Sequence, residues 1–236
     1  MESSVVPSLS DADHGRRRPL IVERLLKDIL LGRIRPGQRL VIRALSCELG
    51  VGQTPLREAL ITLTGIGVVE MQPNRGAIVR SLRPREVRDI YLVRRALECE
   101  AVRSACVRIR EEELRPLADE FRGLIASAGA DRDRLIATAR SLDNTLHDLI
   151  ARECGNIFLK EEMDRLKLLY RAFRDSAYEQ EGSLNNYLRK DVEAREHLAI
   201  VEAMQSRDRR ASVRAMSRHV LSALKYFGDI SRIAKA

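Results

Sequence analysis

Apolar residues recur at helical spacing over most of the chain, and the first part is interrupted far more often than the rest. Residues 1–84 contain 8 Gly and 6 Pro, whereas residues 85–236 contain 5 Gly and a single Pro. Because Gly and Pro end or bend regular elements, this pattern predicts short elements first and long helices afterwards. We expect a loose tail at 1–15, a compact domain at 16–80 and a linker at 81–84.

The compact domain is expected to begin with one helix and a turn. Apolar positions over 20–31 recur at helical spacing, and Pro19 suits the first turn of that helix. Gly32 then ends the helix, and residues 35–38, Arg-Pro-Gly-Gln, predict a β-turn.

Two further short helices and a hairpin follow. Thr54 suits the N-cap of the second of these helices and Pro55 its first helical position. Two short helices joined by a tight turn and followed by a hairpin predict a winged helix-turn-helix. In chain order, the expected elements are helix 43–49, turn 50–53, a helix from 55 that ends at Gly65 and Gly67, strand 68–71, turn 73–76 and strand 77–79.

Positive charge is concentrated at the front of the chain. The net charge is +8; residues 1–83 hold 13 Lys and Arg against 8 Asp and Glu, and residues 84–236 hold 29 against 26. This excess indicates a polyanionic partner, and a helix N-terminus presents free N–H groups to DNA phosphates. Arg57 on that first turn can pair with guanine, and Arg75 at the wing tip can reach a phosphate. A winged helix used for protein contact, with Arg57 as an ordinary surface charge, stays open as an alternative.

The remainder of the chain predicts a helical bundle and no strands. Residues 85–233 would form one all-helical domain, so the expected fold class is mainly α: a winged helix-turn-helix followed by about six bundled helices. These helices are expected at about 85–109, 111–128, 131–153, 156–181, 184–206 and 208–233, with one of the breaks at Gly182-Ser183.

Three of the four histidines fall in three different helices of this bundle, while His14 lies in the tail. His147, His197 and His219 each lie on an apolar helix side, and Asp143 is one turn before His147. If they converge, one carboxylate and three imidazoles suit a divalent ion such as Zn, Ni, Co or Mn. Each histidine could instead be a hydrogen-bonded core residue, and i, i+4 Asp–His pairs are common on helix surfaces.

Composition argues against several other classes of protein. No apolar run approaches the ~20 residues of a membrane helix, and the acidic N-terminus lacks the features of a secretory signal. The four cysteines form no CxxC pair, and we interpret them as reduced thiols of a cytoplasmic protein. Trp is absent and aromatic residues make up 4% of the chain, so a stacking platform for single-stranded nucleic acid is not expected.

Residues 35–79 resemble the N-terminal domain of GntR-family transcription regulators, and the resemblance covers residues 19–80. Its most specific blocks are Leu45 to Val51 and residues 54–60, Thr-Pro-Leu-Arg-Glu-Ala-Leu. Gln53 departs from the family pattern, which commonly has Arg there; Gln could read adenine where Arg would read guanine or phosphate. The resemblance implies DNA contacts from Arg43, Thr54, Arg57, Arg75 and Gly76, and we add Gln53.

Residues 85–233 resemble the FCD ligand-binding domain of the FadR subfamily of these regulators. The resemblance implies a small organic acid as effector, and Arg94 matches an Arg of the first bundle helix that would suit its carboxylate. A salt bridge from Arg94 to Glu98 is the open alternative. The matching stretches are 89–98, 142–147, 154–156, 196–204 and 215–219. The metal ligands implied by the resemblance, with Zn as the first expectation, are Asp143, His147, His197 and His219.

We therefore expect a homodimeric regulator, in this family more often a repressor, that binds double-stranded operator DNA and responds to a small organic acid. A regulator that senses the metal itself, or whose metal is structural, is the alternative. A helical metalloenzyme would need a general base beside the metal. No second carboxylate stands out, since Glu196 beside His197 is expected to point elsewhere, so we expect no enzymatic activity.

Overall fold

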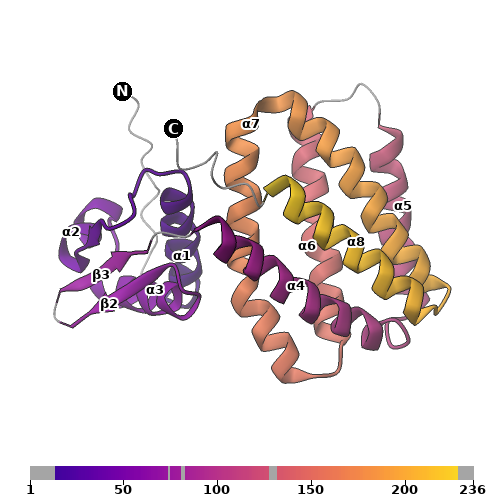
Figure 1. Cartoon of the computed structure of the whole chain (residues 1–236), viewed down its shortest axis with the longest axis horizontal. Helices are drawn as coiled ribbons and strands as arrows, with labels where there is room; N and C mark the ends of the chain where they lie inside the picture. The colour runs from indigo at the N-terminus through magenta and orange to yellow at the C-terminus, as the bar shows by residue number, and fades with distance from the viewer. Residues whose placement is uncertain (1–13, 74, 81–82, 128–131, 228–236) are drawn as a thin grey trace.

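The computed structural model describes residues 14–73, 75–80, 83–127 and 132–227, and shows two groups of elements (Figure 1). The first group consists of α1 (His14–Leu30), β1 (Arg39–Leu40), α2 (Ile42–Leu49), α3 (Gln53–Gly65), β2 (Val69–Gln72) and β3 (Gly76–Val79). The second consists of α4 (Pro84–Ala105), α5 (Glu111–Ala126), α6 (Arg132–Glu153), α7 (Ile157–Gln205) and α8 (Arg209–Phe227). The predicted fold class, a winged helix-turn-helix followed by a helical bundle, is confirmed.

Helices α2 and α3 form the helix-turn-helix, and the three strands form the wing. The sheet has the order β1-β3-β2 and is antiparallel, with Leu40 opposite Ala77. Leu56, Leu60 and Leu63 recur at helical spacing and are fully buried, because this side of α3 packs against α1 and the sheet. The strand β1 was not predicted, since two residues carry no periodicity of their own.

Two predicted helix starts in this domain are wrong. Helix α1 begins at His14, which leaves Pro19 inside the helix rather than in its first turn. Helix α3 begins at Gln53, and its N-cap is Gly52 with no side-chain cap hydrogen bond, so Thr54 is not the N-cap. Pro55 is tolerated as the third helical residue because the first N–H groups of a helix have no intrahelical acceptor in any case.

In the described part of the chain the bundle has five helices rather than six. The predicted helices at 156–181 and 184–206 form the single helix α7 of 49 residues, which passes through Gly182-Ser183. A helical glycine costs only about 1 kcal/mol relative to alanine, too little to end a helix that continues on both sides. The axis of α7 changes direction near its middle in Figure 1, as helices often do at Gly/Ser pairs.

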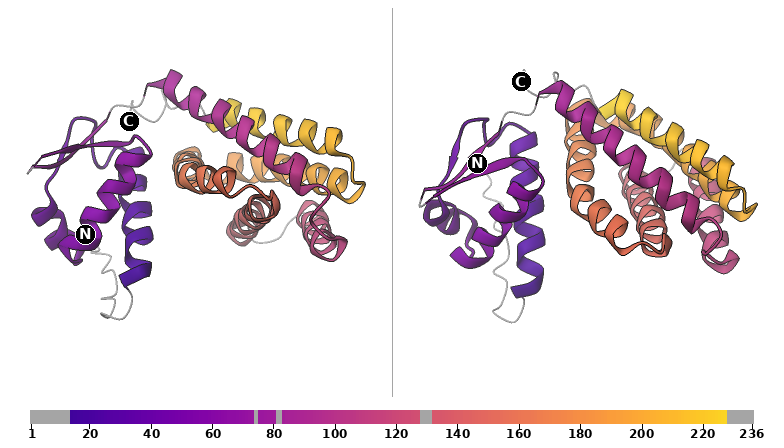
Figure 2. Two further views of the ribbon diagram at one scale, coloured as in Figure 1. Left: turned by 90° about the horizontal axis from the view of Figure 1, so that it is seen from below. Right: turned by 60° about the horizontal axis from the view of Figure 1, so that its bottom comes forward.

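The bundle is layered. Helices α4 and α8 lie side by side, and α5, α6 and α7 lie behind them (Figures 1 and 2). The first half of α7 also runs beside α1, so this helix contacts both the winged helix and the bundle core. Within the described residues, none of the helices has the length and apolar character needed to span a membrane.

Replacing Gly76 with alanine is expected to destabilise the wing. Gly76 has φ +86°, and an added Cβ would overlap the carbonyl oxygen of Leu40 in β1. We expect Gly76→Ala to lower the free energy of unfolding by more than about 1 kcal/mol, measured by urea denaturation. Gly65→Ala is the matched control, because no atom outside its own stretch of helix lies within 4 Å of the added Cβ. Equal stability of the two variants would contradict the prediction.

Candidate metal centre and DNA-binding surface

The residues predicted to contact DNA lie at two places in the winged helix. Arg43 is exposed at the start of α2, and Gln53, Thr54 and Arg57 are exposed on the first turns of α3. The N-terminal turn of α3 therefore presents its free N–H groups and two polar side chains to solvent, an arrangement that favours anions.

The wing supplies the remaining predicted residues. Arg75 is exposed in the turn between β2 and β3, and its backbone N–H donates to the carbonyl oxygen of Gln72. Gly76 is the first residue of β3 and lies against the backbone of β1, so its position also has a structural reason.

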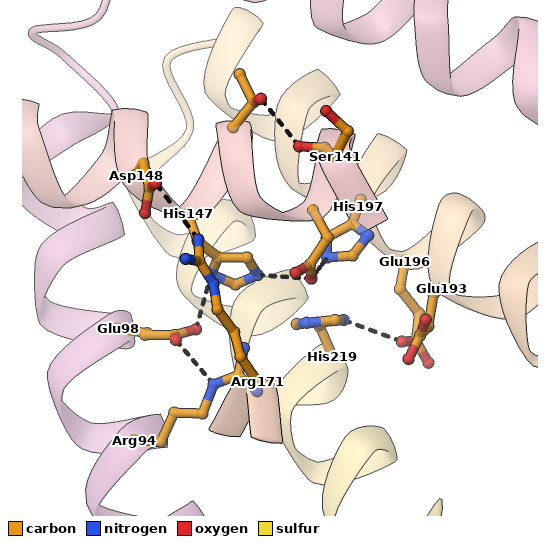
Figure 3. Close-up of polar contacts among 12 residues, drawn as sticks. Arg94, Glu98, Ser141, His147, Asp148, Arg171, Glu193, Glu196, His197 and His219 are labelled. Atoms are coloured by element: carbon orange, nitrogen blue, oxygen red, sulfur yellow. Dashed lines mark hydrogen bonds and ion pairs between the residues drawn. The ribbon is translucent and has the colours of Figure 1, made fainter. Parts of the chain in front are cut away.

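The four predicted metal ligands, although distant in sequence, lie together in the bundle core. Asp143 belongs to α6. His147 also projects from α6, His197 from α7 and His219 from α8 (Figure 3). One possible ligand atom from each residue can be chosen so that all four atoms lie within 4.8 Å of one another. We call these four residues the Asp–His cluster. His197 and His219 are each 2% exposed, so the cluster lies inside the bundle and not on its surface.

The inner ring nitrogens of the Asp–His cluster have the arrangement of metal ligands. The Nε2 atoms of His147, His197 and His219 are buried, and no described group forms a hydrogen bond with them. Asp143 Oδ1 lies 3.1 Å from Nε2 of His197 and 3.6 Å from Nε2 of His147. A buried polar atom without a partner is costly, and these nitrogens are directed to one region, so a shared cation would satisfy them together.

Two carboxylates face the outer nitrogens of the imidazoles. Glu98 Oε2 lies 3.1 Å from His147 Nδ1, and Glu196 Oε2 lies 3.1 Å from His219 Nδ1 (Figure 3). Carboxylates in these positions favour N–H at Nδ1 and leave Nε2 as the lone-pair donor to a metal. Neither role was predicted. Glu196 does point away from its neighbour His197, but toward a histidine on the next helix, which spacing along one helix cannot reveal.

Arg94 is paired inside the protein. Its Nε lies 2.8 Å from Glu98 Oε1, both side chains are buried, and its guanidinium lies 4.7 Å from the centre of the Tyr170 ring. The alternative of an internal salt bridge is thus observed. Arg94 also lines the cavity beside the Asp–His cluster, so the pairing leaves a contact with a ligand possible.

A cavity of about 50 Å³ adjoins the Asp–His cluster, enough for a few water-sized groups. Lys167 and Arg171 of α7 line it, and both pair with Asp148 of α6, at 2.5 Å and 3.4 Å. The α7 side of the cavity therefore carries both signs of charge, Lys167 and Arg171 together with Asp164 and Glu193, and the Asp–His cluster lies on its inner side.

The buried charges of the centre hold one another in defined protonation states. Burial opposes the charge on Glu98, but Arg94 and His147 outweigh this effect and hold the pKa of Glu98 below its usual range. Burial, together with the neighbouring imidazoles of His197 and His147, lowers the pKa of His219 well below its usual range. His219 is therefore neutral at pH 7, which is the form that binds metals.

Comparison with known protein families identifies both parts of the chain. Residues 20–79 match the gntR family of bacterial regulatory proteins, and residues 89–222 match the FCD domain family. The second match alone covers more than half of the 236 residues, so the chain belongs to the FCD-containing GntR regulators. It is a transcription regulator that binds DNA, and not an enzyme.

Individual relatives agree with this assignment. The HTH-type transcriptional repressor RspR of Escherichia coli K12 is 28% identical over 197 residues, covering 83% of this chain and 82% of its own. A probable D-xylose utilization operon transcriptional repressor of Paenarthrobacter nicotinovorans is 26% identical over 205 residues, covering 85% of this chain and 84% of its own.

Solved structures are similar over most of the chain. Escherichia coli McbR/YncC has a TM-score of 0.67 at 18% identity, covering 89% of this chain and 95% of that protein. A putative GntR regulator from Rhodococcus sp. RHA1 has a TM-score of 0.59 at 18% identity, covering 93% and 98%. At this identity the likeness concerns the fold alone.

The metal-free protein is expected to lose stability between about pH 7.5 and about pH 5.5. A histidine whose pKa is lowered by folding binds fewer protons in the native than in the unfolded state, so stability falls as the pH drops through its ordinary pKa of 6.5. Urea unfolding at the two pH values measures the difference, which His219→Gln should reduce by removing one titrating group. Equal or greater stability at the lower pH would refute this expectation.

Proposed function

We propose that this regulator is a homodimeric repressor that binds an operator of two-fold symmetry and responds to a small organic acid held beside a metal ion. The single observation that carries the sensing part is the convergence, beside Asp143, of three buried Nε2 atoms that form no hydrogen bond with a described group. The operator lies on bacterial DNA, so the site of action is the cytoplasm. The proposed domains are a tail at 1–15, the DNA-binding domain at 16–80, a linker at 81–84 and the helical domain at 85–233.

We assign DNA contact to the exposed first turns of α3, to Arg43 and to the wing tip. The support is the exposure of Gln53, Thr54 and Arg57 at a helix N-terminus, together with the positive charge of the first 83 residues. Arg57 is assigned to a base edge, Arg75 to a phosphate or the minor groove, and Gln53 to adenine.

We assign the metal to Asp143, His147, His197 and His219. Three neutral imidazoles and one carboxylate suit a borderline divalent ion, and Zn fits this donor set best, with Ni, Co and Mn as alternatives. A bound ion would act as a Lewis acid toward a carboxylate ligand. The chain's own residues orient the imidazoles through Glu98 and Glu196 and exclude bulk water from the cluster.

An organic acid is the effector class that the cavity suits. Its carboxylate would lie beside the metal, near Arg94, Lys167 and Arg171. A ligand can release the operator only by binding more tightly to the conformation that holds the two winged helices at the wrong spacing. If the metal is purely structural, or is itself the signal, the cavity holds no effector. The measurements below distinguish these two alternatives from an organic-acid effector.

Arg57→Ala is expected to weaken operator binding by about 1–3 kcal/mol, because it removes a proposed base contact. Fluorescence anisotropy with a duplex selected by the wild-type protein measures the loss. Arg115→Ala is the charge-matched control, since Arg115 is exposed on α5 and far along the chain from the winged helix. Unchanged affinity of Arg57→Ala would contradict the assignment.

Zn added to chelator-treated protein is expected to raise the melting temperature. Free Zn at about 100 times its Kd would stabilise the protein by about 2.7 kcal/mol, or roughly 5–10 °C for a chain of this size. His197→Ala should abolish most of the rise, whereas Cys47→Ala, at an exposed potential ligand outside the cluster, should retain it.

The same melting assay separates the roles of metal and effector. With Zn bound, small mono-, di- and tricarboxylates are screened, and an effector should raise the melting temperature further and weaken operator binding. Zn alone weakening operator binding would indicate a metal sensor. If Zn stabilises the protein but neither Zn nor any of the acids changes operator binding, the ion is structural.

A further inference from the structure

The C-terminal end of α3 is bonded to the bundle. Gly65 is the last residue of this helix, so its carbonyl oxygen has no donor within the helix. Arg165 of α7 donates a hydrogen bond from Nη1 to this oxygen at 2.8 Å. A guanidinium at the C-terminus of a helix also interacts favourably with the helix dipole. This bond connects the helix that carries Arg57 directly to α7.

The Arg165 side chain is held in place by its own helix. Glu162, one turn earlier, accepts a hydrogen bond from Arg165 Nε at 2.8 Å and lies 2.7 Å from Nη2. One side of the guanidinium is therefore occupied by Glu162 and the other faces Gly65. Because both side chains belong to α7, a displacement of this turn displaces the donor to Gly65 with it.

A second arginine, which belongs to the winged helix itself, contacts the same turn. Arg80 donates from Nη1 to the carbonyl oxygen of Gly67 at 2.7 Å, and its Nη2 lies 3.1 Å from Glu86 in the first turn of α4. The turn at 65–67 is thus connected to α7 through Arg165 and to α4 through Arg80.

Helices α4 and α7 are also two walls of the cavity. Arg165 lies two residues from each of Met163 and Lys167, which line it. The two walls meet where the Arg94 guanidinium of α4 lies over the Tyr170 ring of α7. A ligand that enters between Arg94 and Lys167 therefore acts on the helix segments to which the turn at 65–67 is bonded.

We propose that Arg165, together with Arg80, transmits the state of the cavity to α3. This inference rests on the proposed function and specifies how its regulation operates. A change in the separation of α4 and α7 changes the position of the Arg165 donor relative to Glu86, and the turn at 65–67 must follow. Helix α3 is about 20 Å long, so a small displacement at this end redirects the exposed residues at its beginning.

Hydrogen exchange of the full chain tests the coupling without knowledge of the operator. Zn is the probe, and the readout is amide exchange over residues 60–70 with and without Zn. In the wild type we expect Zn to change the exchange rates of these amides by a factor of about 5–150, the range typical of allosteric coupling. In Arg165→Ala, Zn should still raise the melting temperature as in the wild type, but its effect on residues 60–70 should be lost. Arg115→Ala, which also removes an exposed arginine paired with a glutamate of its own helix, should behave as wild type.

A second perturbation needs no metal. Met163→Ala enlarges the cavity without altering the Asp–His cluster. It should change amide exchange over residues 60–70 when Arg165 is present. In the double variant with Arg165→Ala it should not.

The outcomes separate this inference from the proposed metal site. A Zn-dependent rise in melting temperature with unchanged exchange at 60–70 would overturn the coupling and leave the metal site standing. Retention of the exchange effect in Arg165→Ala would also overturn it. If Zn does not bind, the metal site fails and the Met163→Ala comparison alone decides the coupling: an equal effect with and without Arg165 rejects it.

Discussion

The bundle depends on how its buried imidazoles are satisfied. Three helices each direct a histidine nitrogen to one region of the core, where an unpartnered polar atom costs roughly 1–3 kcal/mol. Glu98 lies beside the outer nitrogen of His147 and Glu196 beside that of His219, and both carboxylates are in turn near arginines, Arg94 and Arg189. The three inner Nε2 atoms remain without a hydrogen bond from the described residues. The polar centre therefore joins α6, α7 and α8 at one place within the apolar core that surrounds it.

Helix α7 connects the Asp–His cluster and the cavity to the winged helix. Its second half carries His197, while its first half lines the cavity with Lys167 and contacts α3 through Arg165. Because α7 is hydrogen-bonded as one helix through its change of direction, its two halves are joined without an intervening loop. The absence of a break at Gly182-Ser183 is thus relevant to regulation as well as to fold.

Much of this organisation was predictable from sequence, because it rests on local signals. Helical spacing and the distribution of Gly and Pro gave the winged helix and the bundle, and resemblance gave the Asp–His cluster. What sequence did not provide is pairing between elements. Strand β1 exists only because Leu40 pairs with Ala77, and Glu196 acts on His219 across a helix pair. The continuity of α7 depends on a glycine whose cost is small compared with the packing of the helix on both sides.

The pairing of α4 with α8 joins the first and last helices of the bundle. The helical bundle can therefore close only after the ribosome has released nearly the whole chain, whereas the winged helix is complete once about the first 80 residues have emerged. At typical synthesis rates this leaves an interval on the order of 10 s. During that interval the winged helix of the nascent chain is complete, while the bundle that carries the Asp–His cluster is not.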